Sequence, residues 1–325
     1  EPTNQMKALL LADFGAPYYP ALREEHPDLD LVEAYSNEDI LSKIGDAEAV
    51  FGYLTDEQFA AAKKLKWIQT LDAGMEGLFN AVPGIADTDV QVTNARGAGA
   101  PMIGEHGVTL MLALARQLPK FWADKSDHKW DQDGALGVVE YLGNKTCGIV
   151  GLGKSGKEIG WRAKALGMTV IAVDEQPVDG DPIVEDVWGL SRLNDLLDQS
   201  DYVVVTAPYT AKNAGMIGEA ELARMKSSAR LVVTSRGRLV DHNALVSALK
   251  SGGIAGAGLD TTVVEPLPAD NELWDLPNVI ITPHIAGNSE KAHLDERTVD
   301  VFAENLRRYV SGQPLINVVD KQLQY

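Results

Sequence analysis

Three polar segments of the sequence supply an arginine, a glutamate and a histidine, a set that can move a proton on an anionic substrate. Arg236 offers a planar guanidinium that can hold a carboxylate through two parallel hydrogen bonds. His284 can give or take a proton near neutral pH, and Glu265 can orient its ring and stabilise the imidazolium. These residue types indicate acid–base chemistry on a small carboxylic acid.

Each of the three residues also has an ordinary alternative when it is considered alone. Arg236 would be a salt-bridge residue and Glu265 a surface carboxylate before a proline. A lone histidine is usually not catalytic, and His284 is favoured because Pro283 precedes it and a cofactor motif lies upstream. The other histidines are interpreted as solvated or structural: His26, His128 and His293 in polar surroundings, and His106 and His242 near helix starts.

The cofactor motif is a GxGxxG formed by Gly151, Gly153 and Gly156. It follows the short apolar run 147–150 and opens a helix-compatible segment, after which the strand-like run 169–173 stops at Asp174. In such a unit the glycines permit a tight turn, close approach of a pyrophosphate and close packing of helix on strand, and the acid binds a ribose. The alternative is an ordinary strand–turn–helix connection.

The same acid indicates which dinucleotide is bound. Asp174 is followed by Glu175 and Gln176, and no Arg or Lys follows until well downstream. A 2′-phosphate would meet negative charge there and find no cation to pair with. The sequence therefore predicts NAD rather than NADP.

These residues need a scaffold that brings them together at one edge of a sheet. The pattern of the chain predicts parallel sheets, which can do this. Short apolar runs alternate with helix-like segments, which is typical of an α/β fold with helices on both sheet faces. The site segments follow predicted strands, where this architecture places its ligands. The expected strands are 7–11, 29–34, 49–54, 67–71 and 90–93, and then six more at 147–150, 169–173, 202–206, 231–234, 255–259 and 279–282.

Other segments complete this expected layout. Loops 71–77 and 94–101 follow strands and are ligand-loop or hinge candidates, with plain surface turns as the alternative. Segment 102–118 predicts a long apolar helix buried between domains or subunits. Segment 124–133 is interpreted as a polar surface excursion, and 289–310 as a helix that returns the chain to its first domain.

Taken together, the motifs resemble the D-isomer-specific 2-hydroxyacid dehydrogenases over nearly the full length. The resemblance is carried by Asn94 through Glu105-His106, GLGKSG with Asp174, Ala207-Pro208, Ser235-Arg236-Gly237 with Val240-Asp241, Leu259-Asp260 with Glu265-Pro266, and Thr282-Pro283-His284. The chain departs from the common family pattern at Val233, Thr262 and 206–209, beside the expected cofactor site. These departures do not affect the three catalytic candidates.

The resemblance implies a role for each matching residue. Arg236 would bind the substrate carboxylate together with the backbone at Ala73-Gly74, His284 would donate the proton to the keto oxygen, and Glu265 would pair with His284. Asp260 would lie near the nicotinamide carboxamide, and Lys154-Ser155 at the pyrophosphate. The expected cofactor residues are Gly151, Gly153, Lys154, Ser155, Gly156, Asp174, Ala207, Pro208, Thr234, Ser235 and Asp260.

The resemblance also implies two doubly wound domains with the active site in the cleft between them. Residues 1–101 and 288–325 would form a discontinuous, flavodoxin-like substrate domain, and 102–287 a Rossmann NAD-binding domain. A homodimer built largely on the cofactor domain is implied as well. The expected activity is NAD-dependent reduction of a small 2-keto acid to its D-2-hydroxy acid. A non-catalytic NAD(H)-sensing module of the corepressor type and a phosphite-oxidising relative remain alternatives.

Composition restricts the partners and the compartment. The 325 residues carry a net charge of −18, which argues against nucleic acid or an anionic membrane as partner. No apolar run is long enough to span a bilayer, and no signal peptide is recognisable. The single cysteine, Cys147, lies in an expected buried strand, so we expect a packing role, a reducing cytoplasmic location and no metal site.

Overall fold

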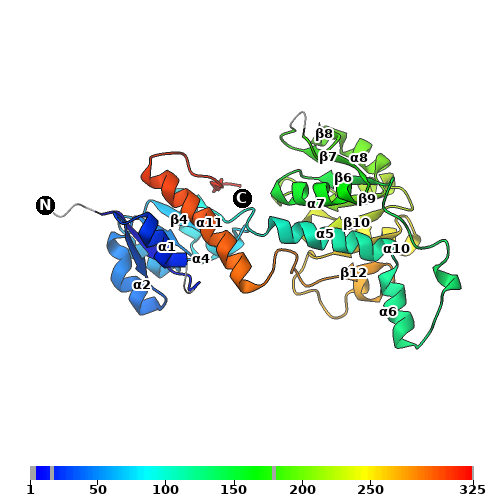
Figure 1. Ribbon diagram of the computed structural model, residues 1–325, viewed down its shortest axis with the longest axis horizontal. Coiled ribbons are helices and arrows are strands. Elements are labelled where there is room, and N and C mark those ends of the chain that lie inside the picture. Colours follow the sequence, from blue (N-terminus) through cyan, green and yellow to red (C-terminus); the bar gives the residue numbers. More distant parts are fainter. Residues whose placement is uncertain (1–4, 15–17, 178–180, 324–325) are drawn as a thin grey trace. The chain divides into compact units, whose positions relative to one another are not determined.

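The computed structural model describes residues 5–14, 18–177 and 181–323, without the side chains of residues 291 and 292. The chain divides into two compact units, each built on its own parallel sheet (Figure 1). Unit 1 contains Glu1–Ala98 and Ser289–Tyr325, and unit 2 contains Gly99–Asn288. The sequence also predicts a helix at 16–25 and a loop rich in Asp and Pro at 175–185; the start of that helix and part of that loop lie outside the described residues.

Unit 1 has five parallel strands in the order β2-β1-β3-β4-β5. This is the flavodoxin-like order expected for it, with the reversal of strand order between β1 and β3. The strands are β1 Lys7–Leu10, β2 Asp30–Glu33, β3 Ala49–Phe51, β4 Trp67–Gln69 and β5 Gln91–Thr93. The helices are α1 Tyr18–Glu25, α2 Asn37–Lys43, α3 Asp56–Ala61, α4 Glu76–Ala81 and α11 Lys291–Val310, with short 3-10 turns at Ile44–Asp46 and Pro83–Asp87.

Helix α11 brings the end of the chain onto the unit 1 sheet. Its Phe302 is fully buried and stacks on Phe51 of β3, with ring centroids 4.2 Å apart, and on Trp67 of β4 at 5.6 Å. Asn305, also fully buried, donates from its amide to Gln69 Oε1 at 2.8 Å. Because these contacts join residues more than 200 positions apart, they fix α11 as an integral layer of unit 1.

Unit 2 has seven parallel strands in the order β12-β11-β10-β9-β6-β7-β8. The strand order reverses between β6 and β9, the point at which doubly wound sheets bind ligands. The strands are β6 Thr146–Val150, β7 Thr169–Asp174, β8 Asp186–Gly189, β9 Tyr202–Val205, β10 Arg230–Val233, β11 Gly256–Leu259 and β12 Val279–Ile281. The helices are α5 Ala100–Ala115, α6 Leu118–Ser126, α7 Lys154–Ala165, α8 Leu193–Gln199, α9 Glu219–Arg224 and α10 His242–Ser251.

The unit 2 sheet is buried on both faces, as the near-continuous apolar runs of its strands require. Alternate residues of each strand enter two separate cores: Ile149 and Cys147 pack with α5 and α7, and Val150 packs with α8, α9 and α10. Burial raises the pKa of the Cys147 thiol to about 12, so the thiol stays protonated and acts as a packing group. The α/β fold class expected from the sequence is confirmed.

One detail of the sequence interpretation is wrong. The unit 2 sheet has seven strands rather than six, because β8 pairs with β7 at the sheet edge. Its four residues include Asp186 and only partly buried side chains, so they lack the apolar run that marks the inner strands. Segment 124–133 lies mostly exposed at the surface, as expected, and its first three residues form the end of α6, whose start is marked by Pro119 in its first turn.

Candidate active site

The glycine loop lies between β6 and α7, at the reversal of strand order in unit 2. Gly151 has a φ of +95°, and a side chain there would meet the Ala207 backbone at 2.6 Å. A side chain at Gly156 would meet the carbonyl oxygen of Gly151 at 2.4 Å, whereas one at Gly153 would point into open space. Gly151 and Gly156 are therefore required for packing, and Gly153 is the position where a ligand can approach the backbone.

Asp174 closes the loop from the end of β7. One carboxylate oxygen accepts the amide of Leu152 at 2.7 Å, and the other accepts the amide of Gln176 at 2.9 Å. A carboxylate has about four acceptor positions, so Asp174 can also take ribose hydroxyls. The same side chain thus holds the glycine loop in shape, a role that sequence reasoning missed.

The segment after β9 forms the other wall of this loop. The amides of Thr206 and Ala207 both donate to Val150 O at 2.9 Å, and the Thr206 hydroxyl donates to Gly151 O at 2.5 Å. Ala207 is buried and Pro208 is exposed. The structure therefore brings the predicted cofactor residues of two neighbouring strand ends together.

Arg236 follows β10, two residues beyond Thr234. It is partly exposed, and its guanidinium donates to the carbonyl of Ser235 at 3.0 Å. The next residue, Gly237, lies against the backbone of Thr262, since a side chain there would sit 2.1 Å from the Thr262 carbonyl carbon. This contact fixes the Arg236 loop beside the loop that carries Glu265.

His284 and Glu265 form a direct pair. His284 Nδ1 lies 2.7 Å from Glu265 Oε2, and both side chains remain partly exposed, at 45% and 38%. The other Glu265 oxygen accepts the amide of Thr262 at 3.0 Å, which fixes the carboxylate plane. With Nδ1 donating to the carboxylate, Nε2 is the ring nitrogen that can exchange a proton with a substrate.

The backbone of the histidine loop is held by Asp260. The amide of His284 donates to the carbonyl of Asp260 at 2.8 Å, and the amides of Ile285 and Ala286 donate to its fully buried carboxylate, each at 2.9 Å. His284 itself has a φ of +53°, in the left-handed region that non-glycine residues adopt at an energetic cost. Such strained residues persist only where surrounding contacts hold them, and Asp260 supplies those contacts.

A second layer behind the histidine loop comes from helix α5. His106 Nε2 lies 2.9 Å from the hydroxyl of Thr282, and that hydroxyl donates to Asp260 at 2.6 Å. His106 was interpreted from the sequence as structural, and its place in this hydrogen-bond chain was missed. The sequence signal for this role is that His106 belongs to the segment, Asn94 through Glu105-His106, that resembles the family. The expected contact of Asp260 with a nicotinamide carboxamide stays a prediction.

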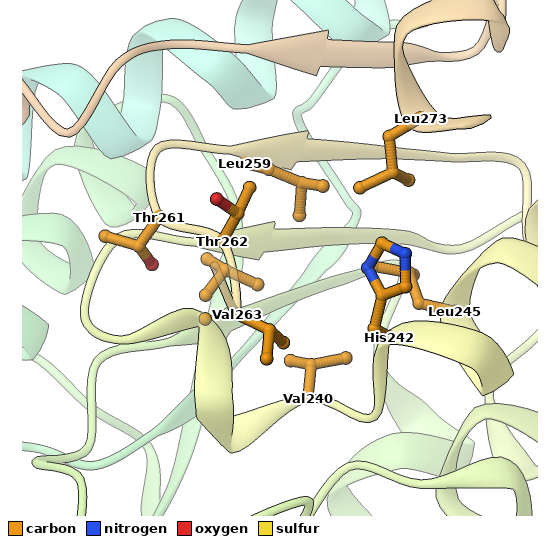
Figure 2. A pocket seen from close by; sticks show the side chains of 10 residues that line it. Val240, His242, Leu245, Leu259, Thr261, Thr262, Val263 and Leu273 are labelled. Atoms are coloured by element: carbon orange, nitrogen blue, oxygen red, sulfur yellow. The ribbon is translucent and has the colours of Figure 1, made fainter. Parts of the chain in front are cut away.

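Figure 2 shows a small cavity beside the loops after β10 and β11, lined by Val240, Leu245, Leu259 and Val263 among others. Its volume is about 20 Å³, room for one water but far below that of a pocket for a keto acid or a nicotinamide. His242 lines the cavity and contacts Asn271 at 3.3 Å. This cavity is therefore a packing gap within unit 2 rather than a ligand pocket.

Comparison with known proteins decides the family. Residues 108–286 match the model of the D-isomer specific 2-hydroxyacid dehydrogenase, NAD binding domain. The chain is also 34% identical over 314 residues to a glyoxylate reductase of Korarchaeum cryptofilum, covering 92% of both chains. The chain belongs to the D-isomer specific 2-hydroxyacid dehydrogenase family. It is therefore an oxidoreductase, and its unit 2 is built to bind a nicotinamide dinucleotide.

Other members of the family share its fold at lower identity. A family protein from Aeromonas salmonicida superposes with a TM-score of 0.80 at 30% identity, covering 98% of this chain and 99% of that one. A D-3-phosphoglycerate dehydrogenase of Archaeoglobus fulgidus is 32% identical over 97% of this chain, which spans only 59% of that longer protein. Relatives that are named for different substrates thus match this chain at similar identity. The family match therefore gives the reaction type but not the substrate.

The residues at the glycine loop fit the dinucleotide of this family. Helix α7 has no acidic residue in its first turn, and its early amides, such as that of Ser155, have no acceptor within the helix. Among the described residues, no group accepts from or donates to the buried hydroxyl of Thr234. Lys154 would add a positive charge at the same helix start. When bound, the cofactor would be held by this loop, Asp174 and the strand ends at 206–208 and 234–235.

The described part of the chain contains no helix long and apolar enough to cross a membrane. Nor do its described residues place three His, Cys, Asp or Glu side chains together in a way that could hold a metal ion.

Proposed function

We propose that this family member is an NAD-dependent dehydrogenase that interconverts a small 2-keto acid and its D-2-hydroxy acid. The observation that carries the proposal is the 2.7 Å contact between His284 Nδ1 and Glu265, on a loop that Asp260 holds in a strained conformation. An acid–base histidine oriented by a carboxylate is the arrangement that reduction of a carbonyl needs.

In the proposed reaction His284 Nε2 delivers a proton to the keto oxygen as a hydride reaches the carbonyl carbon. The nicotinamide supplies that hydride when the cofactor is bound. Glu265 keeps the imidazole oriented and stabilises its charged form, so that the proton is available for reduction. In the reverse direction the neutral imidazole accepts the hydroxyl proton through the same nitrogen.

The substrate carboxylate is proposed to bind Arg236. The guanidinium can take both carboxylate oxygens at once and thereby fix the orientation of the keto group. Ala73 and Gly74, in the loop that follows β4, are proposed to donate their backbone amides to the same carboxylate. The family resemblance supports this role, and no described group accepts from these two amides.

The cofactor is proposed to be NAD rather than NADP. Asp174 lies at the end of β7 and is followed by Glu175, so a 2′-phosphate would face negative charge. A family member from Xanthobacter autotrophicus, 27% identical, was solved with NADPH, so NADPH binding occurs among proteins of this fold. The carboxylate at this position supports NAD for the present chain.

The proposal is tested by steady-state kinetics with NADH and NADPH on a panel of 2-keto acids. We expect turnover of at least one small 2-keto acid, a D-configured product, and a kcat/KM at least about tenfold higher with NADH, since repulsion of a 2′-phosphate costs about 1.4 kcal/mol or more. NADH binding without any turnover would favour the sensing module instead. Reduction of NAD by phosphite without keto acid activity would favour the phosphite-oxidising alternative.

The assembly is proposed to be a homodimer formed through unit 2, in a cytoplasmic location. Exposed apolar side chains gather on α6 and the segment after it, including Trp122, Trp130, Leu136 and Tyr141, which are 56 to 92% exposed. Figure 1 shows α6 and this segment extending from the sheet of unit 2. Several large exposed apolar side chains on one segment are typical of an interface. The cytoplasmic location rests on the single unpaired cysteine.

A further inference from the structure

The loop after β4 in unit 1 presents backbone amides to solvent. The carbonyl of Asp72 accepts the amide of Ala95 at 3.0 Å, and the carbonyl of Ala73 accepts the side-chain amide of Asn94 at 3.0 Å. In the part of the chain that the structure describes, no group accepts from the amides of Ala73 or Gly74. With its carbonyls turned toward the neighbouring loop, the segment offers two adjacent amides to an anion.

A fixed carboxylate stands directly beside these amides. The hydroxyl of Tyr53, at the end of β3, donates to Asp72 Oδ2 at 2.7 Å. Burial of the ring, and next the hydrogen bond to Asp72, raise the pKa of Tyr53, so the phenol stays a neutral donor at any working pH. The hydrogen bond therefore holds the Asp72 carboxylate in place without cancelling its charge.

No opposite charge compensates Asp72 within the described residues, since no Lys, Arg or His forms an ion pair with it. The side chain is exposed, and consecutive Cα atoms lie only about 3.8 Å apart, so its charge acts at the amides of Ala73 and Gly74. We infer that Asp72 makes this enzyme selective for 2-keto acids whose side chain carries no second negative charge. This inference rests on the proposed function.

The selectivity arises because Asp72 repels a substrate that carries two anionic groups more strongly than a substrate that carries one. The carboxylate of every 2-keto acid gains the two amides, which offset the nearby charge of Asp72. A second anionic group, such as a phosphate or a further carboxylate, meets Asp72 without a matching gain. Two unit charges about 12 Å apart near a protein surface repel enough to lower kcat/KM about tenfold.

Selectivity of this kind distinguishes between the substrates after which the relatives are named. A glyoxylate reductase and D-3-phosphoglycerate dehydrogenases match this chain at similar identity. Because of Asp72, we expect this enzyme to act on 2-keto acids with uncharged side chains, such as glyoxylate or hydroxypyruvate. We expect it to act poorly on a phosphorylated three-carbon acid.

The test compares hydroxypyruvate with 3-phosphohydroxypyruvate, which differ only by the phosphate, for the wild type, Asp72→Asn and Asp72→Lys. The ratio of the two kcat/KM values should favour hydroxypyruvate in the wild type, fall about tenfold in Asp72→Asn and fall further in Asp72→Lys. Salt should reduce the ratio in the wild type and change it little in Asp72→Asn, because screening acts only where the charge is present. Thermal unfolding confirms that each variant is folded.

The control is Arg96→Ala, which removes a cation from the neighbouring loop 94–101. A selective loss of phosphohydroxypyruvate turnover in this variant would show that Arg96 recruits the phosphate, and would overturn the inference. An unchanged ratio across the Asp72 series would overturn it as well. Both results differ from failure of the proposed function, in which neither 2-keto acid is reduced at all.

Discussion

At the scale of single residues, the histidine loop combines strain and restraint. His284 is held at a positive φ by hydrogen bonds from its own loop to Asp260, and its ring is held by Glu265. Orientation of this kind reduces the reorganisation that a proton transfer requires. Replacing the groups around His284 should therefore change catalysis more than stability.

Arg236→Ala should lower kcat/KM for a 2-keto acid by about a thousandfold, because a bidentate charged contact is lost in the transition state. Arg236→Lys should restore little, since an ammonium cannot reproduce the planar fork. NADH affinity, measured by fluorescence titration, should stay close to that of the wild type. Arg238→Ala is the matched control, because Arg238 is exposed and lies over the ring of Tyr209. Wild-type kcat/KM in Arg236→Ala would show that this arginine does not anchor the carboxylate.

Glu265→Gln should lower kcat/KM in both directions of the reaction. Glutamine keeps the shape and a hydrogen bond but removes the negative charge that faces the imidazole 2.7 Å away. Because both directions use the same proton transfer, kcat/KM for keto acid reduction and for hydroxy acid oxidation should each fall about tenfold or more. The measurement is kcat/KM in both directions at one neutral pH, with Glu272→Gln as an exposed control. Wild-type values in Glu265→Gln would mean that the Glu265 charge does not act on His284.

At the scale of the element, two glycines of one loop have different roles: Gly151 is needed for packing, and Gly153 for binding of the cofactor. A methyl group at Gly151 would clash with the Ala207 backbone at a φ of +95°, so Gly151→Ala should lower the free energy of unfolding by about 2–4 kcal/mol. Gly153→Ala meets no atom within 4 Å and should fold like the wild type. It should still weaken NADH binding about tenfold, because the methyl group occupies the approach of the pyrophosphate. Equal NADH affinity in Gly153→Ala and the wild type would argue against a pyrophosphate at this position.

Helix α11 provides a second test at this scale. Phe302→Ala should lower the free energy of unfolding of unit 1 by about 3–5 kcal/mol, since it removes a buried ring stacked on Phe51 and Trp67. Urea unfolding followed by tryptophan fluorescence measures the change. Val310→Ala on the same helix is the control, because Val310 is 52% exposed. A loss below about 1 kcal/mol for Phe302→Ala would show that α11 is not an integral layer of the unit.

At the scale of the whole molecule, the chain combines a large negative charge with several exposed apolar side chains on α6 and the segment after it. The net charge of −18 opposes association in general, so a dimer needs a specific apolar contact. The exposed side chains on α6 and the following segment are the residues that can provide it.

Light scattering after size exclusion should give the mass of a dimer for the wild type at micromolar concentration. Trp122→Ser combined with Trp130→Ser should raise the dimer dissociation constant at least about tenfold, because each removes a large exposed apolar group. Trp274→Ser is the control, since Trp274 is 51% exposed but lies on another surface element. A monomeric wild type would contradict the homodimer proposal.

The sequence by itself determined the features that depend on local rules. The glycine spacing with Asp174 fixed the position of the cofactor loop, because positive φ and close backbone contact require glycine. Apolar runs of four to six residues marked nearly every inner strand, because strands buried on both faces are apolar throughout. The same rule missed β8, since an edge strand with partly buried side chains carries no such run.

Only the tertiary structure decided which distant residues meet. The contact of Gly237 with Thr262 sets Arg236 beside the Glu265 loop, and the buried carboxylate of Asp260 gathers the backbone of the histidine loop and, through Thr282, His106 of α5. These partners are separated by up to 176 residues. Their proximity follows from the order in which parallel strands pair and from close packing of the helices, and neither is encoded in the local pattern around any one of them.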